Sequence, residues 1–100
     1  MMNNLLLQLN KSIEFDPQKR VQTLLERGLD FARAGEIFSQ NINTFQDLRR
    51  SYGEPRFITV GFLDGRLTVV VWTQRGSRKR IISMRNANER ETKEYSRGMD

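Results

Sequence analysis

The chain has 100 residues and contains neither cysteine nor histidine. The first absence excludes disulfides, thiolate zinc sites and thiol catalysis. The second removes the commonest general base and the commonest metal ligand. Any chemistry must therefore come from arginine, lysine, aspartate, glutamate, tyrosine, serine or threonine. Without these ligands, and without a close cluster of acidic residues, the sequence predicts a protein that uses neither a metal nor another cofactor.

Long apolar runs are also missing. The longest strongly apolar stretch falls far short of the roughly 18 residues that span a membrane. Leu5-Leu6-Leu7 lacks the basic start and the small-residue cleavage site of a signal peptide. The sequence therefore predicts a cytoplasmic protein without membrane contact. Hydrophobic residues make up 37% of the chain, which is enough for one packed domain of this size.

Positive charge is plentiful and unevenly placed. The net charge is +5, with five basic and six acidic residues in 1–48 and twelve basic and six acidic residues in 49–100. Five basic side chains and no acidic one lie between Arg75 and Arg85. Such a patch is typical of surfaces that bind phosphate groups, most often those of nucleic acids. Solvated strand ends that only aid solubility would have the same composition.

The N-terminal half shows two helix signals after a short strand at Ile13–Phe15. Asp16 followed by proline begins the first helix, and Gly28 ends it. Asp30 caps a second helix that continues to about Ser39. We expect these two helices to form an αα-hairpin on one face of a sheet.

The C-terminal half has the pattern of three consecutive strands followed by a helix. The strands lie within residues 54–85 and are joined by turns at Asp64-Gly65 and Gly76. Asn88 and Glu91 resemble a capping box that opens a final helix. Residues 42–45 could form another strand, and residues 47–53 have the composition of a polar loop. The expected fold class is α+β, with the two N-terminal helices packed on a largely antiparallel sheet and a C-terminal helix.

Four segments in this order resemble the BrnT family, namely IEFDPQKRVQTLLERGLDFARAGEIF, GEPRFITVG, RLTVVVWTQRG and RIISMR. BrnT proteins are toxins of type II toxin–antitoxin systems in the RelE/ParE-like group. The resemblance covers roughly residues 13–97, so we take 1–12 as an N-terminal extension and 13–100 as a single toxin domain. It implies a RelE-like fold and a metal-independent endoribonuclease that acts on RNA and inhibits translation and growth. It also implies neutralisation by a DNA-binding BrnA-like antitoxin in a hetero-oligomer.

One position departs from the family pattern. The first helix of relatives usually ends in Lys-His-Gly, whereas this chain has Glu26-Arg27-Gly28. An arginine stabilises negative charge but transfers protons poorly near neutral pH. Three outcomes stay open: Arg27 acts only by its charge, Glu54 or Tyr52 transfers the proton, or the activity is weak or lost.

Further arginines match the family motifs on the strands. Glu54 and Arg56 match a Glu-x-Arg pair, and they could equally form an ion pair at the strand end. On a regular strand Arg80 and Arg85 point to opposite faces, so we favour Arg75 and Arg80 as phosphate ligands, and Arg85 could instead have a structural role. The predicted catalytic residues are Arg27, Glu54, Arg56, Arg75 and Arg80; the predicted RNA contacts are Lys19, Arg20, Arg78, Lys79 and Arg85; Tyr52 and Tyr95 are further candidates.

Several of these residues have a second interpretation. Lys19, Arg20 and Arg27 share one helical stripe, which could be a solvated face, and Tyr95 could serve packing or antitoxin contact. Two alternative functions stay open as well. The protein could bind nucleic acid without cleaving it, or its basic patch could receive an acidic segment of a partner protein.

Overall fold

The computed structural model describes residues 12–40, 43–49 and 51–98. The predicted N-terminal extension therefore lies almost entirely outside the described residues. In the part of the chain that is described, no helix is long and apolar enough to cross a membrane. The elements are β1 (Ile13–Phe15), α2 (Pro17–Arg27), the 3-10 helix η1 (Phe31–Arg33), α3 (Ala34–Phe38), β2 (Asn43–Gln46), β3 (Phe57–Leu63), β4 (Arg66–Arg75), β5 (Arg78–Asn86) and α4 (Glu89–Gly98).

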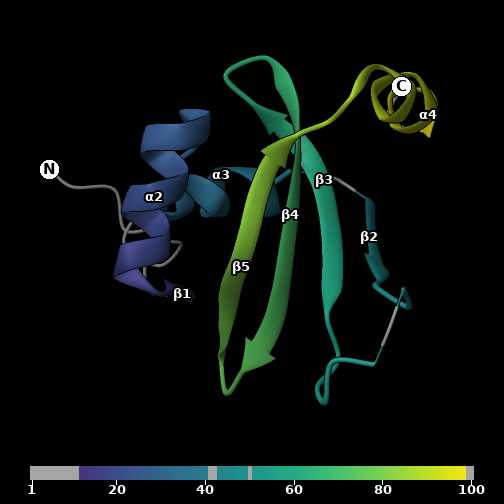
Figure 1. Ribbon diagram of the computed structural model, residues 1–100. Helices are drawn as coiled ribbons and strands as arrows, with labels where there is room; N and C mark the ends of the chain where they lie inside the picture. The colour runs from purple at the N-terminus through teal and green to yellow at the C-terminus, as the bar shows by residue number, and fades with distance from the viewer. Residues whose placement is uncertain (1–11, 41–42, 50, 99–100) are drawn as a thin grey trace, which may run out of the picture.

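The predicted α+β class is confirmed, but the sheet is mixed. Its five strands lie in the order β1-β5-β4-β3-β2 (Figure 1). β2, β3, β4 and β5 pair antiparallel, whereas β1 pairs parallel with β5. The expectation of a largely antiparallel sheet thus needs a correction at one edge. Helices follow β1 instead of a tight turn, so no local signal sets its direction relative to the last strand.

The turn between β3 and β4 forms as predicted. Asp64 and Gly65 have φ angles of 52° and 76°. Two successive positive φ angles are what a two-residue hairpin of type I′ requires, and Asp-Gly is a preferred pair for it. The turn sets the register in which Leu63 pairs with Arg66.

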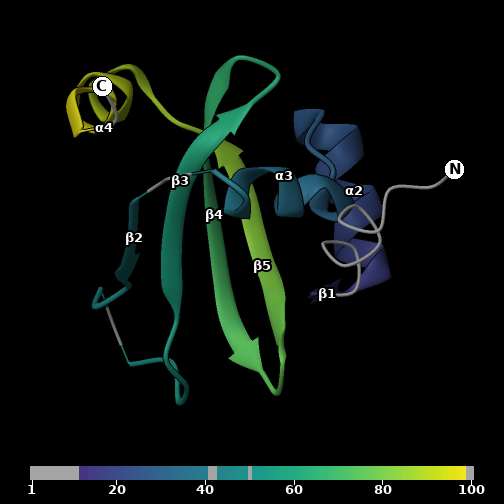
Figure 2. The same ribbon diagram turned by 180° about the vertical axis from the view of Figure 1, so that it is seen from behind.

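The two faces of the sheet are covered by different elements. On one, which we call the helix face, η1 and α3 pack Phe31 and Ile37 against Val70, Trp72 and other strand residues. On the opposite side, which we call the α4 face, Tyr95 packs against a smaller cluster of strand residues. Figures 1 and 2 show α3 and α4 on opposite sides of the sheet.

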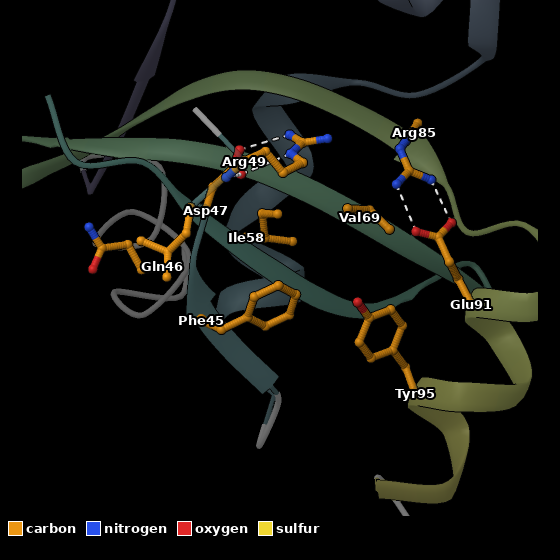
Figure 3. Close-up of a pocket in the computed structure, with 10 residues that line it drawn as sticks. Phe45, Gln46, Asp47, Arg49, Ile58, Val69, Arg85, Glu91 and Tyr95 are labelled. Carbon is orange, nitrogen blue, oxygen red and sulfur yellow. Dashed lines mark hydrogen bonds and ion pairs between the residues drawn. The ribbon is translucent and has the colours of Figure 1, made fainter. Parts of the chain in front are cut away.

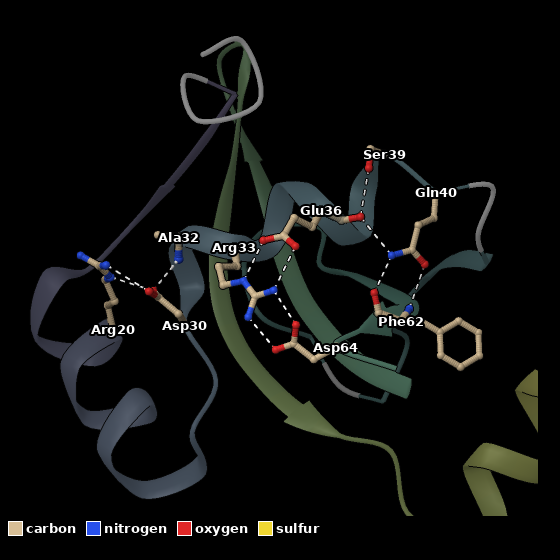
Figure 4. A network of polar contacts seen from close by, with 9 residues as sticks. All are labelled: Arg20, Asp30, Ala32, Arg33, Glu36, Ser39, Gln40, Phe62 and Asp64. Carbon is tan, nitrogen blue, oxygen red and sulfur yellow. Dashed lines mark hydrogen bonds and ion pairs between the residues drawn. The ribbon is translucent and has the colours of Figure 1, made fainter. Parts of the chain in front are cut away.

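The second helix lies between Asp30 and Ser39 as predicted, but its first turn is a 3-10 helix. Asp30 caps it, because its side chain accepts a hydrogen bond from the Ala32 backbone N–H. Arg33 then binds Glu36 and Asp64, with contacts of 2.7 Å to each (Figure 4). The single helix expected from Asp30 to Ser39 is therefore divided into η1 and α3. Arg33 ties this short unit to the turn between β3 and β4.

Helix α2 docks through its cationic stripe and not through its apolar residues. Arg20 Nε binds Asp30 at 2.7 Å, and its guanidinium lies over the Phe15 ring. Arg27 Nη1 donates to the Met84 carbonyl at 2.8 Å. Leu25, on the apolar stripe, is 81% exposed. The stripe is therefore solvent-accessible, as the first interpretation has it, because Arg27 is exposed and the Arg20 side chain is 41% exposed, but both arginines also bind partners within the fold.

Candidate functional site

A bulge in β5 changes where the strand arginines point. Val71 pairs with Ser83 and Trp72 pairs with Ile81, so the residue between the two partners on β5 has no counterpart on β4. Because of this extra residue, Arg80 and Arg85 lie on the same face of the sheet, the α4 face. Their partners on β4, Thr73 and Val69, lie four residues apart and share that face. The prediction of opposite faces was wrong because it assumed a regular strand.

A cavity of about 440 Å³ lies on the α4 face, between α4 and the part of the sheet that ends at the edge strand β2 (Figure 3). Arg49 and Arg85 form its cationic wall. An aromatic and aliphatic part of the lining comes from Phe45, Ile58, Val69 and Tyr95, and Gln46, Asp47, Leu48 and Glu91 complete it. The cavity thus places two guanidiniums opposite an apolar surface.

Arg49 is held by a buried carboxylate. The Asp47 side chain accepts hydrogen bonds from Arg49 Nε at 2.8 Å and Nη2 at 2.7 Å, and from the Tyr52 hydroxyl at 3.0 Å. The Asp47 side chain is 1% exposed and the Arg49 side chain 66% exposed. The Arg49 hydrogen bonds hold the pKa of Asp47 well below its usual range, and Asp47 raises the pKa of Arg49.

Arg85 is held in the same manner by α4. Its two terminal nitrogens bind Glu91 at 2.7 and 2.8 Å. Glu91 also forms the predicted capping box with Asn88, through bonds of 3.0 and 2.8 Å. The Glu91 side chain is 15% exposed and that of Arg85 42%. The bonds from Arg85 lower the pKa of Glu91 to about 2, and Glu91 raises the pKa of Arg85.

The two ion pairs point the same way. In each, the carboxylate lies deeper than the guanidinium, so the positive end of the pair is the more exposed end. Figure 3 shows both guanidiniums turned toward the same space. The charge of Arg49 acts to lower the pKa of Arg85, as expected for two neighbouring cations. The net charge of the two pairs is zero, but an entering phosphate would meet their cationic ends first.

Tyr95 supplies a neutral hydroxyl on the opposite wall. Burial raises the pKa of this phenol above its ordinary value, so the group keeps its proton near neutral pH. Its ring lies nearly parallel to that of Phe45, with 6.0 Å between the ring centroids. The cavity can therefore stabilise an anion with two arginines and offer one proton from a tyrosine.

Comparison with protein-family models matches residues 15–91 to the ribonuclease toxin BrnT of type II toxin–antitoxin systems. The chain belongs to this BrnT family. A comparison with curated proteins gave no match. Membership confirms the resemblance found in the sequence and implies an RNA target and an antitoxin partner.

Several residues predicted for BrnT chemistry lie in a second cavity beside the first. This cavity, of about 550 Å³, is lined by Tyr52, Glu54 and Arg56 and shares Asp47 with the first. Arg56 lies over the Tyr52 ring at 4.1 Å. Glu54 forms an ion pair with Arg75, at 3.3 Å. The sequence suggested an ion pair of Glu54 with Arg56 at this strand end, and Arg75 is the partner instead. The structure thus brings four predicted residues into one neighbourhood.

The other predicted BrnT residues are dispersed. Arg20 and Arg27 engage Asp30 and a backbone carbonyl, as described above. Lys79 Nζ lies over the Trp72 ring at 5.2 Å, which places it on the helix face. Arg80 pairs with Glu14 at 3.6 Å. Lys19 and Arg78 are exposed, on α2 and at the start of β5.

Four residues that line the first cavity had not been predicted as site residues: Phe45, Asp47, Arg49 and Glu91. Asp47 and Arg49 lie in a segment that was predicted to be a polar loop, and an Asp-x-Arg pair is too common to indicate a site. Glu91 was recognised only as a helix cap. The signal in the sequence that could have indicated this cavity is Phe45, the one aromatic residue in a short, otherwise polar strand.

Proposed function

We propose that this BrnT-family protein is a metal-independent endoribonuclease whose reaction takes place at the cavity between Arg49, Arg85 and Tyr95. One observation carries the proposal: two guanidiniums, each fixed by a more deeply buried carboxylate, face one space. Fixed cations stabilise charge that develops in a transition state at no cost of reorganisation. Arginine suits phosphate because its planar fork stays charged and can offer two donors to phosphate oxygens.

The proposed reaction uses the RNA's own nucleophile. The 2′-hydroxyl attacks the adjacent phosphorus and loses its proton, and the bond from phosphorus to the 5′-oxygen breaks. The products are a 2′,3′-cyclic phosphate and a 5′-hydroxyl. In this scheme Arg49 and Arg85 stabilise the charge on the non-bridging oxygens, and the neutral Tyr95 phenol donates a proton to the leaving 5′-oxygen.

Glu54 is our proposal for the proton acceptor, acting through a bridging water, because its carboxylate lines the adjoining cavity and not the first one. Asp47 and Glu91 fit that role poorly, because their pKa values are lowered and arginines occupy their oxygens. Glu54 lies in the adjoining cavity and contacts Arg75 at the longer distance of 3.3 Å. Arg56, Arg75 and Arg80 would then bind phosphates on either side of the cleaved one, and a BrnA-like DNA-binding antitoxin would block this surface.

Cleavage of single-stranded RNA by the purified protein is expected to continue in excess EDTA. The chain has no histidine or cysteine, and the described residues hold no group of acidic side chains placed to bind a metal. The protein can be produced by cell-free synthesis. The measurement is the amount of RNA that ends in a 2′,3′-cyclic phosphate, with and without EDTA. Loss of cleavage with EDTA and its return with magnesium would contradict the mechanism. Tight RNA binding without any cleavage would favour the non-catalytic alternative.

Replacement of Arg27 by alanine distinguishes the predicted catalytic role of this residue from the structural role that its bond to the Met84 carbonyl indicates. The hydrogen bond to the Met84 carbonyl predicts a loss of stability, with Tm lower by about 5 °C. The described lining of the cavity includes no α2 residue, so cleavage measured well below Tm should change little. Arg27→Lys is the matched control, because it keeps the charge. A large loss of cleavage in a folded Arg27→Ala protein would return Arg27 to the catalytic residues.

A further inference from the structure

Phe45 occupies an unusual place for an aromatic residue. It lies on the edge strand β2 and is 39% exposed, among polar neighbours. Thr44, the preceding residue, turns to the helix face and bonds the Thr59 hydroxyl at 2.8 Å. Phe45 pairs in register with Ile58 and lines the cavity of Arg49 and Arg85. An exposed aromatic on a sheet edge is a liability for aggregation, which a binding role would offset.

Tyr95 extends this aromatic surface from another element. Its ring and the Phe45 ring differ in orientation by only 20°, so together they border the cavity with similarly oriented faces. Figure 3 shows the two rings on the side opposite Arg49 and Arg85, with Ile58 and Val69 between the two sides. One wall of the cavity is thus cationic and the other is flat and aromatic.

This division matches the two parts of a nucleotide. A phosphate is anionic, whereas a base presents a flat surface that stacks on aromatic side chains in a sequence-tolerant way. The bases of a duplex are already paired and stacked, so only an unpaired nucleotide can offer its base in this manner. The cavity volume of about 440 Å³ is in the range of small-ligand sites.

We propose that Phe45 and Tyr95 form a stacking subsite for one unpaired base of single-stranded RNA, beside the phosphate held by Arg49 and Arg85. The proposal rests on the proposed ribonuclease function and adds the class of substrate, an unpaired segment of RNA. Phe45 would act by positioning the nucleotide and takes no part in proton transfer.

Binding of two short fluorescent 2′-O-methyl oligonucleotides tests the subsite. Both resist cleavage and carry the same phosphates, but one has abasic residues in its central positions. The wild-type protein should bind the intact oligonucleotide about tenfold more tightly than the abasic one, and Phe45→Leu should remove most of that difference. Phe45→Trp should preserve it. Phe62→Leu is the matched control, because Phe62 is 40% exposed and lies outside the cavity lining.

Equal binding of the two oligonucleotides by the wild-type protein would overturn the subsite, as would a full base preference in Phe45→Leu. Cleavage of unmodified RNA of the same sequence is measured in parallel. If the wild-type protein cleaves it while Phe45 proves irrelevant to binding, the proposed function stands and only the subsite falls. If the wild-type protein cleaves no RNA, the proposed function fails first. Thermal unfolding of each variant confirms that the compared proteins are folded.

Discussion

RNA cleavage is expected to fall by roughly 100- to 1000-fold when Arg85 is replaced by alanine, the usual effect of removing one fixed donor to a developing oxyanion. Arg85 turns its guanidinium into the cavity from β5, and Glu91 holds it with two bonds below 3 Å. Its loss removes a cation and also leaves the carboxylate of Glu91 to repel the phosphate. The measurement is the single-turnover rate of cleavage of a labelled RNA.

The double variant Arg85→Ala/Glu91→Gln separates these two effects. If repulsion by the bare carboxylate contributed much of the loss, the double variant recovers part of the rate. Arg85→Lys keeps a charge but not the fork, so it should retain a minor fraction of the activity. Arg66→Ala is the matched control, because Arg66 is exposed at the start of β4 and outside the cavity lining.

Tyr95→Phe gives an independent check on the same cavity. It keeps the ring and removes the hydroxyl, so cleavage should fall by roughly 100-fold while RNA affinity is nearly retained, as for a lost proton donor. Cleavage at the wild-type rate by Arg85→Ala and by Tyr95→Phe would place the reaction elsewhere. The cavity of Glu54 and Arg56 would be the next site to test.

Local signals in the sequence predicted the parts of the fold that depend on a few neighbouring residues. Asp16 accepts a bond from the Gln18 N–H, and Gly28 ends α2 with a φ of 70°. The Asp64-Gly65 turn and the Asn88–Glu91 capping box also formed as expected. Each of these devices is complete within about four residues, so its outcome does not depend on the rest of the chain.

Features that depend on distant contacts could not be predicted in this way. The parallel pairing of Ile13 with Lys79 joins residues from opposite ends of the domain. The docking of α2 through Arg20 depends on Asp30 and Phe15, which meet it only in the folded chain. No glycine or proline in the sequence indicates the bulge opposite Val71. The bulge nevertheless determines on which face of the sheet Arg85 lies.

The same limit explains why the first cavity could not be predicted. Abundant arginine drew attention to cations on the strands, and of these Arg85 lines the cavity, whereas Arg49 follows β2. The sequence could not show that Asp47 is buried, because aspartate in a polar segment is normally solvated. Burial of that carboxylate is what fixes the guanidinium of Arg49, and a contact of this kind appears only in three dimensions.

Asp47→Ala is expected to destabilise the protein by roughly 2 kcal/mol, because it breaks a multiply bonded ion pair whose carboxylate is buried, although its arginine is 66% exposed. In a domain of this size that corresponds to a Tm lower by about 10 °C. The lost bonds are those from Arg49 and from the Tyr52 hydroxyl. Differential scanning calorimetry at pH 7 would measure the change, with Glu36→Ala as the control, since Glu36 is a more exposed carboxylate that also pairs with an arginine.

The pH dependence distinguishes an ion pair from simple packing. A carboxylate whose folded pKa is lowered contributes stability that is fully present above its unfolded pKa, near 4, and is lost as the pH falls toward its folded pKa. Asp47 and Glu91 both have lowered pKa values, that of Glu91 reaching about 2. The wild-type protein should therefore lose stability between about pH 5 and pH 2, and Asp47→Asn should lose less, because it lacks one of the carboxylates whose pKa is lowered in the folded state. Equal acid sensitivity of the two proteins would show that the charge of Asp47 does not hold Arg49 in place.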